Sequence, residues 1–192
     1  MTEPRPDTPD CASPPCLAHE LDPLWSGRAG YAVPLRAPVR AEHSYVQRLC
    51  ATPAQVLPLL CPVRETDWIA DWRPQYVISA SGLAEPDCVF ATPAPAGGSA
   101  LWYVTRHDAL QGYVEMVRFV PEHTACRLEI WLQADGDSAC LATVRYRLTS
   151  LGSVAGDAAV AAYTAEHYLV FMRDWERRLN HWLRTGRCLP AD

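Results

Sequence analysis

The segment RETDWIADW, residues 64–72, brings acidic and aromatic side chains close together. If it is helical, Trp68 and Trp72 share one face, because residues four apart are neighbours on a helix, and the three carboxylates are distributed around them. Carboxylates at this spacing can hold a cation or act as acid and base, or they are simply solvated surface charge. The two indoles either line the mouth of a ligand pocket or pack the segment onto the rest of the fold.

Glu115 is a carboxylate in an apolar, strand-like segment, where alternation places it on one face with Tyr113 and Phe119. A carboxylate on an apolar face must be paired, protonated or functional. One interpretation is a cross-strand ion pair with Arg127 or Arg145 on an outward face, and the other is a role in a pocket.

The histidines occur singly, and none lies in a recognised nucleophile motif. His43 is the one histidine that we expect to face a pocket, although a hydrogen-bonded core histidine fits the same pattern. His43 and Glu115 are therefore the candidate catalytic proton carriers. All basic residues are Arg, so Schiff-base catalysis by a Lys side chain is excluded, and no Gly-rich phosphate loop occurs.

The net charge and the hydropathy of the chain argue against nucleic acid as a partner and against a membrane span. The formal net charge is -5 at pH 7, which gives no electrostatic reason to bind nucleic acid. No apolar run approaches the roughly 18 residues that a membrane span needs, and the N-terminus is acidic and Pro-rich without the apolar stretch of a signal peptide. We expect a cytoplasmic protein.

The cysteines are spaced neither as CxxC pairs nor with histidines as zinc ligands. Cys11 and Cys16 lie in a Pro-rich stretch that cannot preorganise a site. We expect no metal and no cofactor. Four other cysteines occur singly inside apolar, strand-like segments, which is typical of reduced, buried thiols. They are Cys50, Cys88, Cys126 and Cys140.

The chain divides into a Pro-rich, partly disordered N-terminal tail at residues 1–37, one domain at residues 38–187, and a short C-terminal tail at residues 188–192. The domain is expected to begin with a strand at 39–49, followed by a brief helix that Thr52 caps and Pro53 opens. Period-two segments separated by turn residues then predict an antiparallel meander, with strands at 75–80, 88–92, 100–106, 112–120, 125–133 and 138–150.

After Gly152 the apolar period changes to three and four, which predicts one continuous helix of about seven turns over 154–185, ended by Gly186. Trp175 and Trp182 are expected to anchor this helix rather than contact a ligand. On the last two strands, a charged ladder is expected on the solvent face, formed by Arg127, Glu129, Arg145 and Arg147.

Three stretches resemble the SRPBCC or START-like superfamily of the polyketide cyclase/dehydrase type: ATPAQVLPLLCPVRETDWIADW (51–72), YVTRHDA (103–109) and WERRLNHWLRTG (175–186). The first is similar to a largely uncharacterised bacterial branch of that superfamily. The resemblance implies an α+β helix-grip fold, in which an antiparallel sheet of about seven strands curls around a long C-terminal helix. Members bind lipids, hormones or polyketides between sheet and helix, and some catalyse cyclisation or dehydration, but no common catalytic residue carries over.

We therefore expect a cavity that binds a small hydrophobic or aromatic ligand, lipid-like or polyketide-like. The alternative is an enzyme of the cyclase/dehydrase or hydrolase type that uses acid–base chemistry in the same cavity. A third hypothesis is an interaction protein that uses its tail or an edge strand, and the chain fits a monomer or a homodimer. The expected ligand-binding residues are Trp68, Trp72, Phe90, Trp102, Tyr146 and Met172.

Overall fold

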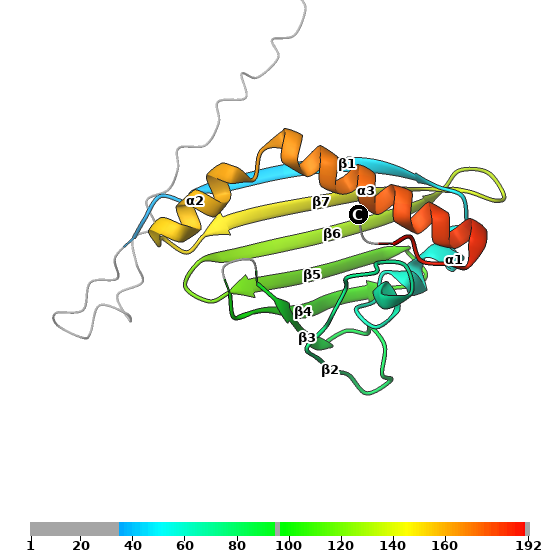
Figure 1. Ribbon diagram of the computed structural model, residues 1–192, viewed down its shortest axis with the longest axis horizontal. Coiled ribbons are helices and arrows are strands. Elements are labelled where there is room, and N and C mark those ends of the chain that lie inside the picture. Colours follow the sequence, from blue (N-terminus) through cyan, green and yellow to red (C-terminus); the bar gives the residue numbers. More distant parts are fainter. Residues whose placement is uncertain (1–34, 95–96, 191–192) are drawn as a thin grey trace, which may run out of the picture. The chain divides into compact units, whose positions relative to one another are not determined.

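A computed structural model describes residues 35–94 and 97–190. Its centre is a seven-stranded sheet in the order β1-β7-β6-β5-β4-β3-β2, with every neighbouring pair antiparallel (Figure 1). The strands are β1 (Arg40–Leu49), β2 (Tyr76–Ile78), β3 (Val89–Pro93), β4 (Ser99–Asp108), β5 (Tyr113–Val120), β6 (Thr124–Ala134) and β7 (Cys140–Ser150). The sequence predicted each of these strands and the α+β class.

Alternation along β6 and β7 gives the sheet one apolar and one charged face. Leu128, Val144 and Tyr146 are buried on the inner face, under the helices. On the outer face, Glu129 accepts hydrogen bonds from Arg145 and pairs with Arg127 at 3.2 Å. The predicted charged ladder is therefore present, and it keeps the outer face of the central strands polar.

Short helices follow β1: α1 (Pro53–Val56), η1 (Leu57–Leu59) and η2 (Arg64–Asp67). Thr52 precedes α1 in extended conformation, and its backbone N–H donates to Gln55 Oε1. Pro58 lies within η1, so the α-helix stays at one turn as its sequence predicts. The buried leucines of this segment close one end of the core.

The expected continuous C-terminal helix is in fact two helices, α2 (Val154–Ala162) and α3 (Ala165–Thr185). Thr164 interrupts the helix in an extended conformation, and its side chain accepts a hydrogen bond from the backbone N–H of His167, so it acts as the N-cap of α3. The buried residues of α2 are Gly156 and Val160, while its alanines at 158, 161 and 162 are exposed.

The helix α3 lies along the β1 side of the sheet (Figure 1) and buries the stripe that its period predicts, with Met172, Trp175 and Leu179 in the core. Arg178 is also buried, and its guanidinium donates to Asp174 at 2.6 Å. Gly186 ends the helix in the left-handed region, at φ 65°.

Three of the four cysteines predicted to be buried thiols are buried and free, whereas Cys50 is exposed. Its position just after β1 explains this difference, since the apolar face of the strand ends at Leu49. Cys11, Cys16 and nearly all of the predicted N-terminal tail lie outside the described residues. No helix in the described ranges is long and apolar enough to cross a membrane.

Candidate functional site

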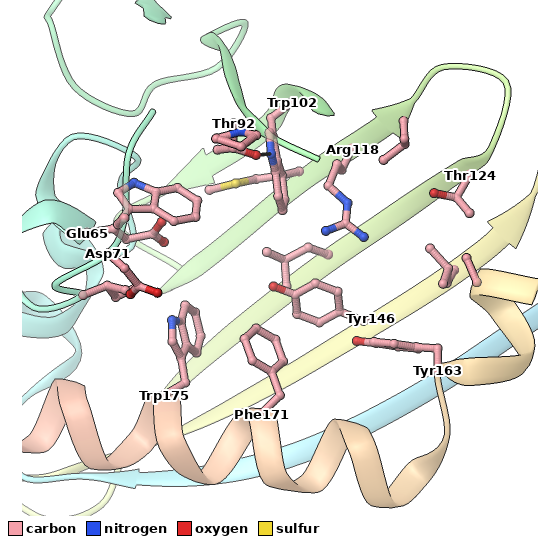
Figure 2. A pocket seen from close by; sticks show the side chains of 18 of the residues that line it. Glu65, Asp71, Thr92, Trp102, Arg118, Thr124, Tyr146, Tyr163, Phe171 and Trp175 are labelled. Atoms are coloured by element: carbon pink, nitrogen blue, oxygen red, sulfur yellow. Dashed lines mark hydrogen bonds between the residues drawn. The ribbon is translucent and has the colours of Figure 1, made fainter. Parts of the chain in front are cut away.

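A cavity of about 770 Å³ lies between the inner face of the sheet, the two C-terminal helices and the loop that follows η2 (Figure 2). Strands β3 to β7 supply its floor, while α2 and α3 supply one wall. The segment from Glu65, in η2, to Arg73 supplies the opposite wall. The helix-grip topology thus leaves a space where the helices do not pack directly on the sheet.

Aromatic side chains hold much of the cavity wall in fixed orientations. Phe90 and Trp102 stack with their ring centroids 5.3 Å apart and an interplanar angle of 8°. The indole N–H of Trp102 donates to Thr92 Oγ1 at 3.0 Å, which fixes the ring on the floor. From the helix side, Phe171 meets Tyr146 edge-on at 6.1 Å. The wall offers flat, preorganised apolar surfaces.

Trp175 has two roles in this structure. Its ring lies 5.2 Å from that of Trp68, so it anchors α3 to the η2 segment as expected. It also lines the cavity beside Phe171 (Figure 2), a position that the sequence did not indicate. Trp68 itself is fully buried beneath this contact, with its indole N–H donating to the backbone carbonyl of Leu59.

Arg118 brings a positive charge into the cavity from the inner face of β5. Its guanidinium carbon lies 5.2 Å from the centre of the Trp102 ring, in cation–π contact. Its Nε atom is buried and has no hydrogen-bond partner within the described part of the chain. Figure 2 shows the guanidinium extending toward the Tyr146 ring.

Two tyrosine hydroxyls face the same region. The Tyr163 hydroxyl is buried without a hydrogen-bond partner among the described residues. Burial raises the pKa values of Tyr146 and Tyr163, and the charge of Arg118 offsets part of this rise at both hydroxyls. Tyr168 differs, because its hydroxyl donates to the backbone carbonyl of Val144 at 2.7 Å. The hydroxyls of Tyr146 and Tyr163 are thus neutral donors at physiological pH.

Glu65 enters the cavity from the wall opposite α2 (Figure 2). Its carboxyl makes no hydrogen bond or ion pair with another residue in the described ranges, and burial raises its pKa to about 8. Glu65 is half-buried at the cavity wall, so it is less exposed than the solvated surface charge that was weighed as the alternative. Asp71 fits that description better, since it is exposed where it borders the cavity.

Four of the six expected ligand-binding residues line the cavity: Trp72, Phe90, Trp102 and Tyr146. Trp68 and Met172 are fully buried in the core and are not part of the lining. The indole N–H of Trp72 donates to the Pro62 carbonyl at 2.7 Å, which holds this ring at the loop wall. Contact of these residues with a ligand stays a prediction.

The two candidate proton carriers lie elsewhere. His43 Nε2 lies 2.8 Å from the backbone carbonyl oxygen of Tyr163, and the imidazole ring stacks on Tyr168. His43 is therefore a half-buried, hydrogen-bonded residue. Glu115 points to the outer face, where Arg127 pairs with it at 2.5 Å and the Tyr113 hydroxyl donates to it at 2.8 Å. Burial raises the pKa of Glu115, but these donors outweigh it and hold the pKa below its usual value. Neither residue lines the cavity.

Sequence reasoning missed Arg118, Tyr163 and Phe171. A signal for Arg118 was present, because the alternation that puts Glu115 outside puts Arg118 inside with Met116. A lone basic residue on an apolar face is the same kind of signal that drew attention to Glu115. The helix break hid Tyr163, which follows α2 directly.

No protein-family model matches the chain, and no curated protein matches it either. Solved structures do match. Norcoclaurine synthase from Thalictrum flavum, a point mutant in complex with a transition-state analogue, aligns over 79% of this chain and 100% of its own, at 10% identity and a TM-score of 0.58. A protein from Rhizobium loti aligns over 76% and 99%, at 11% identity and a TM-score of 0.55. A third structure, from Rhizobium leguminosarum, aligns over 79% and 99%, at 12% identity and a TM-score of 0.52. The chain shares its helix-grip fold with these structures.

Proposed function

We propose that this protein binds a small hydrophobic or aromatic molecule, lipid-like or polyketide-like, in the cavity between the sheet and the C-terminal helices. The observation that carries the proposal is a cavity of about 770 Å³ with a largely aromatic wall. Ligand pockets in proteins commonly span roughly 300 to 1,000 Å³ and combine apolar walls with a few polar groups. A tightly packed helix would have left no such space.

A structural neighbour supports the aromatic part of this proposal. Norcoclaurine synthase from Thalictrum flavum, in complex with dopamine and hydroxybenzaldehyde, shares the fold at a TM-score of 0.52 and 9% identity. In the present chain, Phe90, Trp102 and Phe171 offer ring faces and edges to a planar ligand. Such rings favour offset-stacked and edge-on contacts with other aromatic groups.

The proposal can be tested with a neutral fluorescent probe, N-phenyl-1-naphthylamine, titrated into wild type and two variants. Ala158 and Ala159 are both exposed residues of α2, but only Ala159 borders the cavity. Ala159→Trp should obstruct the cavity and weaken probe binding at least tenfold. Ala158→Trp adds the same indole outside the cavity and should bind as wild type does.

Binding that saturates at one probe per chain and is lost only in Ala159→Trp would support the proposal. Absence of saturable binding to wild type, or equal binding to both variants, would contradict it. Native mass spectrometry of freshly purified protein, in search of a retained small molecule, would then identify the natural ligand.

A second candidate function is acid–base catalysis in the same cavity, and Glu65 favours it. A carboxyl whose pKa is about 8 is protonated at neutral pH and can deliver a proton to a bound carbonyl, hydroxyl or ester oxygen. Such a step would serve cyclisation, dehydration or hydrolysis. In this candidate function Glu65 replaces the two proton carriers expected from sequence, which lie outside the cavity.

Hydrolysis of 4-nitrophenyl esters by wild type and Glu65→Gln provides the test. Catalysis through Glu65 as the acid predicts turnover that declines above pH 8, where the carboxyl loses its proton, and that is lost in Glu65→Gln. Equal rates for the two proteins, or no turnover by either, would leave ligand binding as the function of the cavity and remove Glu65 as its acid for this class of substrate.

A further inference from the structure

The charge of Arg118 has no counter-charge in the described part of the cavity. No carboxylate oxygen among the described residues lies within 4.0 Å of its guanidinium, and its Nε is buried without a hydrogen-bond partner. The Trp102 ring, 5.2 Å away, is the aromatic contact that holds the group. Arg118 is half-buried, and its buried Nε lacks the hydrogen-bond partner that buried polar groups normally have.

The carboxylates that border the cavity do not serve as this partner. Asp174 is engaged by Arg177 and Arg178 from its own helix. Asp71 lies on the loop wall, on the far side of the cavity from Arg118 in Figure 2. Glu65 lies on that wall as well, and its pKa is raised, whereas a guanidinium close by would lower it. The positive end of the cavity is therefore left for a group from outside the described chain.

The side chains around Arg118 are hydrogen-bond donors. The side chains of Tyr146 and Tyr163 lie in the same part of the cavity as Arg118 (Figure 2), and burial raises the pKa values of both hydroxyls still further above physiological pH, so both can donate. The guanidinium adds several N–H donors in a planar arrangement that suits two oxygen atoms of one anion. Stacking on Trp102 limits its motion before a ligand arrives.

We propose that the ligand carries an anionic group, a carboxylate, sulfonate or enolate, which binds Arg118 with the Tyr146 and Tyr163 hydroxyls as additional donors. The apolar body of the ligand then extends along Phe171 and Trp175 toward Glu65 (Figure 2). This inference rests on the proposed binding function and adds that the ligand is an amphipathic aromatic acid, held in one orientation. A cavity that recognises only apolar shape has no use for a half-buried arginine whose Nε lacks a partner among the described residues.

Two fluorescent probes that differ in one charged group make the test direct. The compound 8-anilinonaphthalene-1-sulfonate is N-phenyl-1-naphthylamine with an added sulfonate. Wild type should bind the sulfonate more tightly than the neutral probe, although the protein carries a formal net charge of -5. In Arg118→Leu the affinity for the sulfonate should fall by roughly tenfold to a hundredfold, as for loss of a charge-assisted hydrogen bond, while the neutral probe binds within about twofold of wild type.

Two further variants separate the contribution of the planar guanidinium from that of its positive charge. Arg118→Lys keeps the charge without the planar donors and should recover part of the affinity for the sulfonate. Arg40→Gln removes an exposed charge from β1 and should leave both affinities unchanged, which measures the effect of net charge alone. Thermal unfolding of each variant shows that the dye reports a folded cavity.

The outcomes separate the two proposals. If wild type binds neither probe at a single saturable site, the binding function itself fails. If the neutral probe binds but the sulfonate binds no better, or if Arg118→Leu leaves the sulfonate affinity unchanged, the cavity binds ligands and the anion inference is overturned. If Arg118→Leu weakens both probes equally, the arginine contributes packing rather than recognition of an anion, and the inference is likewise overturned.

Discussion

Replacing Glu65 by Gln should make the protein more stable, and increasingly so as the pH rises. Burial in the cavity raises the pKa of this carboxyl from 4.5 to about 8. Between these two values the folded chain keeps a proton that the unfolded chain has released, so the folded state binds more protons. Stability therefore falls with rising pH across this window, and it falls because of Glu65.

The size of the effect follows from the shift in pKa. One pKa unit corresponds to about 1.4 kcal/mol, so the complete shift corresponds to about 5 kcal/mol. Part of this free energy is already lost below pH 5, the lowest pH of the experiment. Water in the cavity further reduces the free-energy cost of burying the charged carboxylate. We expect Glu65→Gln to gain about 2 to 3 kcal/mol over wild type between pH 5 and pH 8.

Urea unfolding of both proteins at half-unit pH steps from 5 to 8.5 measures this difference. Glu166→Gln, which removes an exposed carboxylate from the first turn of α3, controls for net charge. Its difference from wild type should stay nearly constant with pH. If Glu65→Gln and wild type also differ by a constant amount, the carboxyl of Glu65 is hydrated and titrates normally, and the reasoning about the cavity wall is refuted.

Two further predictions concern packing. Trp175→Ala removes a ring that is 7% exposed and lies 5.2 Å from Trp68, so it should cost about 3 to 5 kcal/mol in urea unfolding; a thermal midpoint within about a degree of wild type would contradict this. Gly156→Ala places a methyl group 2.2 Å from the His123 carbonyl oxygen and 2.8 Å from Ser150 Oγ, which forces α2 away from the strand ends. We expect a loss of about 1 to 3 kcal/mol, and an unchanged free energy of unfolding would show that α2 can shift freely.

The fold could be predicted because its signals are local. Each strand alternates apolar and polar residues, and turn residues separate consecutive strands, so neighbouring antiparallel pairs follow from chain order. The exception is the helix break at Thr164. The alanine-rich segment around it fits either one helix or two, and the capping hydrogen bond from His167 decides between them in three dimensions.

The site was harder to predict, because a strand residue points into the cavity only if it lies on the side of the sheet that the helices cover. The strand β5 has apolar residues on both faces, so alternation alone left open whether Glu115 or Arg118 faces inward. Glu65 illustrates a different limit. Its neighbours in sequence are polar, and only the packing of η2 over the sheet removes part of this side chain from water.

A crystal structure of the protein with 8-anilinonaphthalene-1-sulfonate tests the central claim most directly. The proposals predict one probe molecule between the sheet and α3, with its rings against Phe171 and Trp102 and its sulfonate hydrogen-bonded to Arg118. A probe bound instead on the outer face of the sheet, near Tyr113 and Trp131, or an unoccupied cavity in crystals saturated with probe, would contradict the assignment of this cavity as the binding site.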